Sequence, residues 1–407
     1  YVRFNGRGEI LFSLYPISRQ ENGAIFFRFF SAVVFLLSFP FYTVLIKGKE
    51  VTSMTAIIKR EIRNYLKRPL FWLGIVIVIF GVFQQLEPYL NIHYITSEKE
   101  IENDYPDVVP EADVYEGYIP ASEAERRAGW EEEIRETLTA EFGMSSQEAE
   151  TVIESLSDMT VEAACRYLRD VYGYYGAINA WENSAYRKGT KEEINAYIES
   201  RLGEHPFSYY FSRKFADFTG LFMAFLATVL LAFLFMQDMR KNTYELLHTK
   251  PVSAGQYVLG KTAGGFLVCL LVLVIMNLVF YTACRIYTAD AGFEVRLMDF
   301  IGATCIYLLP NMLMIVCVYA LISLLFKNPL PAVPMLVLYI LYSNMGSRNA
   351  DGVFGYYGRP LAIIVRFPGM FFDTAPPPMA LFNQCFLIIA SIGVILICMQ
   401  LWRRRKI

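Results

Sequence analysis

The chain has 407 residues, of which 55% are hydrophobic and 15% aromatic, and its formal net charge is −2. This composition is too apolar for an ordinary soluble domain, and it lacks the basic surface of a nucleic-acid-binding protein. The small net charge conceals a segregation, because residues 88–214 contain 12 Lys+Arg and 26 Asp+Glu, a balance of −14. An acidic block within an apolar, otherwise basic chain predicts a water-facing domain inserted into a membrane protein.

The residues before Met54 invite a separate interpretation. Lys49-Glu50-Val51 can be encoded by a purine-rich bacterial ribosome-binding sequence at a suitable spacing from Met54. We therefore interpret residues 1–53 as read-through from upstream DNA and expect translation to begin at Met54. The alternative is an optional extra transmembrane helix, because residues 29–46 are uncharged, apolar and about long enough to cross a bilayer.

Six windows of the remaining chain are apolar and contain no Asp, Glu, Lys or Arg. They are residues 69–86, 218–237, 262–284, 300–326, 328–347 and 374–402. A transmembrane helix needs roughly 20 apolar residues, and its backbone polar groups must pair internally. Because six such windows cannot all be hidden in one soluble core, we predict an all-α membrane protein with six transmembrane helices. The first lies within residues 54–87, and the other five lie within residues 215–407.

Lysine and arginine residues cluster in short segments that should share one side of the membrane. These are Lys59, Arg60, Arg63, Lys67 and Arg68 before the first window, Arg240, Lys241, Lys250 and Lys261 between the second and third, Lys327 between the fourth and fifth, and Arg403, Arg404, Arg405 and Lys406 after the last. The positive-inside rule assigns this side to the cytoplasm. We therefore expect a multi-pass protein of the bacterial cytoplasmic membrane with a cytoplasmic C-terminus.

Residues 55–68 have the pattern of an amphipathic helix. Ile58, Ile62 and Tyr65 recur at helical spacing, and basic residues fill the positions between them. A helix of this kind lies in the membrane interface against anionic headgroups, so membrane lipids are expected partners.

The acidic block 88–214 is predicted to be a mainly helical extracytoplasmic domain between the first and second transmembrane helices. Three helix starts are marked by capping boxes, in which a hydroxyl and a carboxylate three residues later satisfy each other's backbone amides. The pairs are Ser122 with Glu125, Ser145 with Glu148, and Thr190 with Glu193. Gly203 is expected to close the last of these helices.

Residues 255–262, Gly-Gln-Tyr-Val-Leu-Gly-Lys-Thr, match the phosphate-loop pattern G-x-x-x-x-G-K-[ST]. A true phosphate loop joins a strand to a helix and surrounds the phosphates with backbone amides. Here a helix-favouring segment and Pro251 come before the motif, and a membrane window begins at Thr262. We therefore expect no nucleotide site at Lys261 and no cofactor.

Other chemistry-bearing patterns are missing from the sequence. Six of the seven cysteines lie within or at the ends of apolar windows, where Cys behaves as a small hydrophobic residue. The three histidines are scattered without metal-ligand spacing, and no G-x-S-x-G motif occurs. The sequence therefore predicts neither a metal site nor an enzyme.

The most informative stretch follows the second window. It reads Asp238-Met-Arg-Lys-Asn-Thr-Tyr-Glu-Leu-Leu-His-Thr-Lys-Pro-Val-Ser253, followed by Tyr257-Val-Leu-Gly-Lys261. With its charged helix, T-x-P-[VI]-S turn and Y-x-x-[GA]-K segment, it resembles the cytoplasmic loop of bacterial ABC-2 type transporter permeases. The basic helix before the first window, the six windows and the large outer loop are similar to that family as well.

The resemblance implies the membrane subunit of an ABC transporter, acting as an exporter. It would pair with a second permease copy or a paralogue, and loop 238–262 would bind a cytoplasmic ATP-binding ABC subunit that hydrolyses the ATP. The implied contact residues are Glu245, Leu246, Leu247, Lys250, Pro251 and Ser253. In this family the segment between the fifth and sixth transmembrane helices dips back at the outer face, and the aromatic residues of 346–376 suit such an interface.

Two other functions remain open on the sequence. One is a membrane-anchored sensor or scaffold with an extracytoplasmic ligand-binding domain, and the other is an intramembrane enzyme. A sensor would not need the charged loop between the second and third windows, whereas a permease would. The enzyme is disfavoured because no catalytic constellation accompanies the windows.

Overall fold

The computed structural model describes residues 53–101, 113–236, 238, 253–345, 347–348, 354–355 and 359–404. The chain divides into Tyr1–Glu50 and Val51–Ile407, and every described residue belongs to the second unit. The interpretation of residues 1–53 as read-through therefore falls almost wholly outside the described residues. So does most of the predicted loop 238–262.

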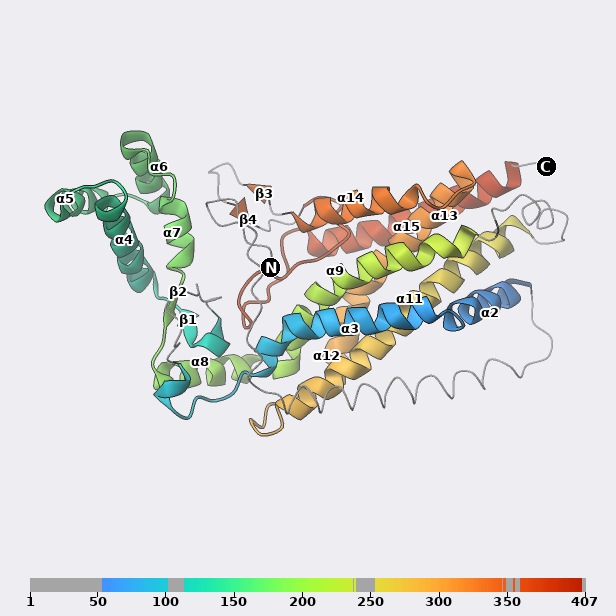
Figure 1. The fold of residues 1–407 in the computed structure, drawn as a ribbon, viewed down its shortest axis with the longest axis horizontal. Helices are drawn as coiled ribbons and strands as arrows, with labels where there is room; N and C mark the ends of the chain where they lie inside the picture. The colour runs from blue at the N-terminus through green and yellow to red at the C-terminus, as the bar shows by residue number, and fades with distance from the viewer. Residues whose placement is uncertain are drawn as a thin grey trace. The chain divides into compact units, whose positions relative to one another are not determined.

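Among the described residues, five helical segments are long and apolar enough to cross a membrane (Figure 1). They are α3 (Pro69–Leu90), α9 (Phe207–Met236), α11 (Ala254–Tyr287), the run of α12 (Leu297–Ala303), η3 (Thr304–Leu308) and α13 (Leu309–Phe326), and α15 (Ala380–Arg404). The predicted helical membrane architecture is thus confirmed. The count of six is not, because the window at residues 328–347 forms only the 13-residue helix α14 (Ala332–Asn344). At 1.5 Å per residue α14 is about 20 Å long, against a hydrocarbon core of about 30 Å.

Helix α9 starts well before the uncharged window that predicted it. It begins at Phe207 and includes Arg213, Lys214 and Asp217, which the sequence analysis did not place in a transmembrane helix. Charged groups are costly in such a helix unless they are paired. Here each has a partner in the segment between α14 and α15, so the charges are accommodated by protein contacts.

The fourth long segment changes helix type partway along. Residues Thr304–Leu308 form a π-helix that ends two residues before Pro310. Proline has no amide hydrogen to donate into the helix, and a π-turn is one way to accommodate the missing bond. The π-helix is also bonded to α11, because Asn277 Nδ2 of α11 donates a hydrogen bond of 2.9 Å to Thr304 Oγ1.

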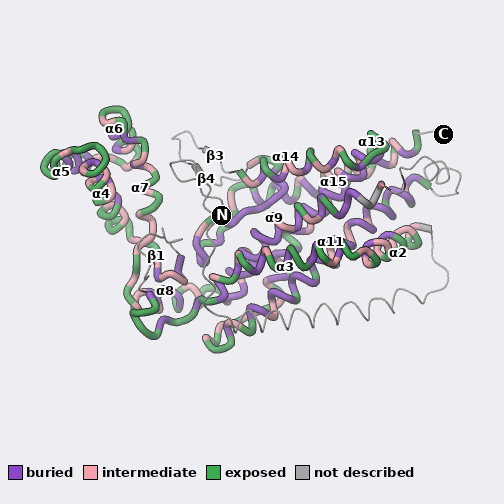
Figure 2. Tube along the Cα trace, in the orientation of Figure 1, coloured by how far each residue is buried: buried purple, intermediate pink, exposed green. Residues whose placement is uncertain are grey.

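The long helices pack in neighbouring pairs. Helix α2 (Ser53–Leu66) lies against α11, α3 against α9, and α13 against α15. Figure 2 shows the buried residues gathered between the helices. The outward-facing residues of α3 and α15 are large and apolar, among them Leu73, Phe80, Ile389 and Ile392, as expected for surfaces that meet lipid.

A domain with short helices is inserted between α3 and α9. Its elements are η1 (Glu98–Glu100), η2 (Val114–Glu116), β1 (Tyr118–Pro120), α4 (Glu123–Ala140), α5 (Ser146–Leu156), α6 (Val161–Tyr172), α7 (Ala177–Asn183), β2 (Tyr186–Lys188) and α8 (Lys191–Glu204). Strands β1 and β2 pair antiparallel, with Ile119 opposite Arg187. A second small ladder, β3 (Ser347–Arg348) with β4 (Phe354–Gly355), lies between α14 and α15 in the chain.

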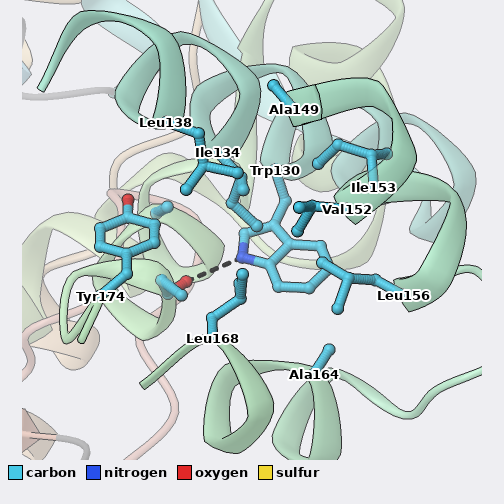
Figure 3. Packing of buried hydrophobic residues seen from close by; sticks show 12 residues of the cluster. Trp130, Ile134, Leu138, Ala149, Val152, Ile153, Leu156, Ala164, Leu168 and Tyr174 are labelled. Carbon is cyan, nitrogen blue, oxygen red and sulfur yellow. Dashed lines mark hydrogen bonds between the residues drawn. The ribbon is translucent and has the colours of Figure 1, made fainter. Parts of the chain in front are cut away.

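The inserted domain has its own hydrophobic core around Trp130 (Figure 3). Trp130 is fully buried among side chains from α4, α5, α6 and α7, including Ile134, Leu156 and Leu168. Its indole Nε1 donates a hydrogen bond of 2.7 Å to the carbonyl oxygen of Ala177. A buried tryptophan needs such a partner, so this bond fixes α7 against α4.

The three predicted capping boxes are confirmed. Ser122, Ser145 and Thr190 each cap a helix, and the glutamate three residues later bonds back to the cap amide in every case. The prediction for Gly203 was wrong, because α8 continues through it to Glu204. A left-handed glycine does close α6, where Gly173 has φ of 72°.

Candidate functional site

Of the six predicted contact residues, the structure describes only Ser253. It caps α11, since its Oγ accepts from the Gln256 amide at 3.1 Å and the Gln256 side chain accepts from the Ser253 amide at 3.0 Å. Glu245, Leu246, Leu247, Lys250 and Pro251 lie outside the described residues. Helix α11 therefore begins inside the predicted loop 238–262, directly after its N-cap Ser253.

The residues that match the phosphate-loop pattern lie in the first turns of α11. Gly255, Gly260 and Lys261 are all helical, and the helix continues to Tyr287. Beyond the first turn of a helix the backbone amides bond to carbonyl oxygens one turn earlier, so the amides of Gly260 and Lys261 cannot surround a phosphate. The motif therefore needs another explanation.

Lys261 is buried and paired with two carboxylates. Its Nζ lies 2.8 Å from Glu61 Oε1 in α2, and it also forms an ion pair with Asp238, just after α9. The three side chains are only 4% to 6% exposed. Asp238 in addition accepts a hydrogen bond of 3.1 Å from the hydroxyl of Tyr257. We call Glu61, Asp238 and Lys261 the α2–α11 ion cluster.

Two glycines of the motif region let α2 approach α11 closely. A Cβ atom on Gly260 would lie 3.0 Å from Ile57 Cβ, and one on Gly264 would lie 2.9 Å from Glu61 Cβ. Glycines four residues apart commonly allow such close packing between membrane helices. Gly260 and Gly264 thus serve helix packing.

Aromatic side chains extend the same contact region. The ring of Tyr257 stacks on Trp402 near the end of α15, with ring centroids 3.8 Å apart. Tyr65 of α2 donates a hydrogen bond of 3.1 Å to the carbonyl oxygen of Leu230 in α9. Helices α2, α9, α11 and α15 are therefore joined at one end of the bundle.

The outer surface of α2 carries its basic residues. Lys59, Arg60, Arg63 and Lys67 are exposed, whereas Glu61 and Tyr65 face α11 and α9. The only acidic residue of the helix is thus turned inward and paired. This leaves a cationic face suited to anionic headgroups.

Toward the opposite end of α9, its charged residues hold the segment between α14 and α15. Asp217 pairs with Arg366 and accepts from the Phe367 amide at 3.0 Å. Lys214 donates to the carbonyl oxygens of Phe367, at 3.0 Å, and Gly369. A buried charge is costly unless it is paired or hydrogen-bonded. Here Arg366 and backbone groups supply the partners of Asp217 and Lys214.

The inserted domain contributes to the same network. Asp113 is buried, and its carboxylate accepts from the Phe371 amide at 3.0 Å. Phe371 also packs against Phe207, with ring centroids 4.9 Å apart, and Phe372 against Tyr197 of α8. The segment is therefore fastened to both α9 and the inserted domain.

Neither charged cluster was predicted from the sequence. Lys261 was placed in the loop 238–262 and Lys214 in the water-facing domain 88–214, while Asp217 fell between that domain and the second apolar window. One signal was available: Glu61 is the only acidic residue in α2, one turn from Tyr65 on its inward face. An isolated acid on the inward face of a basic helix indicates a buried cationic partner, although its identity cannot be read from one sequence.

A family model described as ABC-2 family transporter protein matches residues 55–354. The chain therefore belongs to the ABC-2 transporter family, and it is a multi-pass ABC transporter permease. The resemblance to ABC-2 type transporter permeases is thus confirmed. No curated protein and no solved structure matches the chain.

Proposed function

We propose that this permease is the membrane subunit of an exporter driven by ATP hydrolysis on a separate ATP-binding subunit. The match of residues 55–354 to the ABC-2 family carries the proposal. Export and the ATP-binding partner come from the resemblance of residues 238–261 to the cytoplasmic loop of such permeases. The second subunit of the pore would be another copy or a paralogue.

The proposal includes six membrane crossings. Trp402 of α15 stacks on Tyr257 of α11, and Tyr257 bonds to Asp238 of the α2–α11 ion cluster. Helix α2, through Glu61, and the end of α15 thus lie at one end of the bundle, which supports an even number of crossings. The described residues contain five long apolar segments, an odd number, so α14 is proposed as the remaining crossing. The basic residues at that end favour the cytoplasm of a bacterial cell.

The contact with the ATP-binding subunit is proposed to involve residues 245–253. Leu246 and Leu247 would bury apolar surface, while Glu245 and Lys250 would make polar contacts. Reversing the charge in Glu245→Lys should weaken association, because it places like charges together or leaves a buried charge unpaired. Association is measured with an ABC-type ATP-binding subunit from the same organism, by co-purification and by titration.

ATP binding to the isolated permease separates this proposal from a nucleotide site on the chain itself. We expect no saturable ATP binding before or after Lys261→Ala, because Lys261 is occupied by Glu61 and Asp238. Arg285→Ala, at the other end of α11, is the matched control. Saturable binding that is lost only in Lys261→Ala would contradict the proposal.

A further inference from the structure

Three segments that are distant in sequence meet at the ammonium group of Lys261. Glu61 comes from α2, Asp238 follows the end of α9, and Lys261 lies in the second turn of α11. Asp238 and Lys261 also bracket the predicted loop 238–262. The ion cluster therefore closes the base of that loop and joins it to α2.

The ion pairs of the cluster hold α2, the end of α9 and the start of α11 together. Two buried carboxylates share one buried ammonium, and the Tyr257 hydroxyl donates to one of the carboxylates. Removing one member of a buried ion pair leaves a charge without compensation, so separating the three segments is strongly opposed. Close packing at Gly260 and Gly264 leaves α2 little room to slide.

We propose that Glu61, Asp238 and Lys261 act as positioning residues that transmit movement of the ATP-binding subunit to the membrane helices. This inference rests on the proposed function. A subunit that pushes on the loop displaces its base, and the cluster makes α2, the end of α9 and the start of α11 move together. Glu61 links α2 to α11, whereas Asp238 links α9 to α11, so the two carboxylates have separable roles.

The test uses the full-length chain in complex with the ABC-type ATP-binding subunit from the same organism that co-purifies with it. The measured quantity is the coupling ratio, the ATP hydrolysis rate of the complex divided by that of the ATP-binding subunit alone. Glu61→Gln and Asp238→Asn keep side-chain shape and remove charge. Arg285→Gln, an exposed residue of the same helix α11, is the control. Co-purification is recorded for every variant.

We expect both cluster variants to keep the complex. The difference between the coupling ratio and 1 should shrink about fivefold or more, which is the lower end of common coupling between sites. The control should behave as the wild type. A merely structural role would reduce assembly of the complex and leave the coupling ratio of the assembled fraction unchanged.

A disulfide separates the two roles. A Cβ atom on residue 260 would lie 3.0 Å from Ile57 Cβ, short of the about 3.5–4.5 Å of a disulfide, so a bond between Ile57→Cys and Gly260→Cys ties α2 to α11 once the two helices separate slightly. The oxidised pair should restore the coupling ratio of Glu61→Gln, and reduction should remove the rescue. It should not restore Asp238→Asn, because the α9 link is still broken. Mass spectrometry of linked peptides verifies the bond.

Three results would overturn the inference while leaving the proposed function intact: unchanged coupling ratios in both variants, failure of the variants only by loss of assembly, or a disulfide that rescues both variants or neither. A wild-type chain that forms no complex, or that leaves the ATP hydrolysis rate of the partner unchanged, would instead refute the proposed function and this inference with it.

Discussion

Glu193 has two roles in the inserted domain. Its carboxylate accepts from the Thr190 amide at 2.8 Å, which caps α8, and both of its oxygens accept from the Arg187 guanidinium, at 2.7 and 2.9 Å. The hydrogen bonds from Arg187, followed by the Thr190 amide, lower the pKa of Glu193 from 4.5 to about 2. Hydrogen bonds from Ser122 and Ser145 likewise lower the pKa of Glu125 and of Glu148, respectively.

The lowered pKa of Glu193 predicts acid sensitivity of the inserted domain. A carboxylate with a lowered folded-state pKa contributes stability that is present above its unfolded pKa and is lost as the pH falls through the folded value. The window is therefore from 4.5 down to about 2. In Glu193→Gln the unfolding temperature should fall at pH 7, and its further decline across this window should be smaller than in the wild type.

The measurement for Glu193 is thermal unfolding of the full chain in detergent, followed by tryptophan emission, because Trp130 and Trp181 lie in the inserted domain. Glu192→Gln, on the same helix but outside the capping box, is the control. Equal pH dependence of Glu193→Gln and the wild type would contradict the assigned role.

At the scale of helices, the sequence predicted what depends on local patterns. The capping boxes at Ser122, Ser145 and Thr190 and the long apolar segments follow from residue type and spacing alone. The start of α9 at Phe207 and the burial of Lys261 depend on partners supplied by distant segments. A single sequence does not show which distant segments pair. Lys214 and Lys261 were therefore both predicted to lie in water-exposed segments outside the transmembrane helices.

The close approach of α2 and α11 predicts that Gly264 tolerates no large side chain. In Gly264→Leu the new Cβ would lie 2.9 Å from Glu61 Cβ, and the remaining atoms would push α2 outward. Overpacking of this kind costs about 1–3 kcal/mol. Amide hydrogen exchange of α2 should accelerate in Gly264→Leu. Gly393→Leu in α15 is the control, because open space surrounds that position, and equal acceleration in both would refute the explanation.

Across the whole molecule, two charged clusters lie toward opposite ends of helix α9. The α2–α11 ion cluster joins α2, α9 and α11 beside the predicted loop, while Lys214 and Asp217 of α9 hold the segment that Asp113 also contacts. Helix α9 takes part in both. An axial or rotational displacement of α9 would therefore act on both clusters.

The proposed topology predicts that the inserted domain faces the outside of the cell. Glu132 lies on α4 and is exposed, so a cysteine placed there should react with a membrane-impermeant maleimide added to intact cells. Native Cys165 provides little background, because burial and the nearby Glu162 raise its pKa to about 11, and the thiolate is the reactive form. Arg404→Cys, at the end of α15, should react only after the membrane is permeabilised. The reverse pattern at these two positions would invert the topology, and with it the assignment of the α2–α11 ion cluster to the cytoplasmic side.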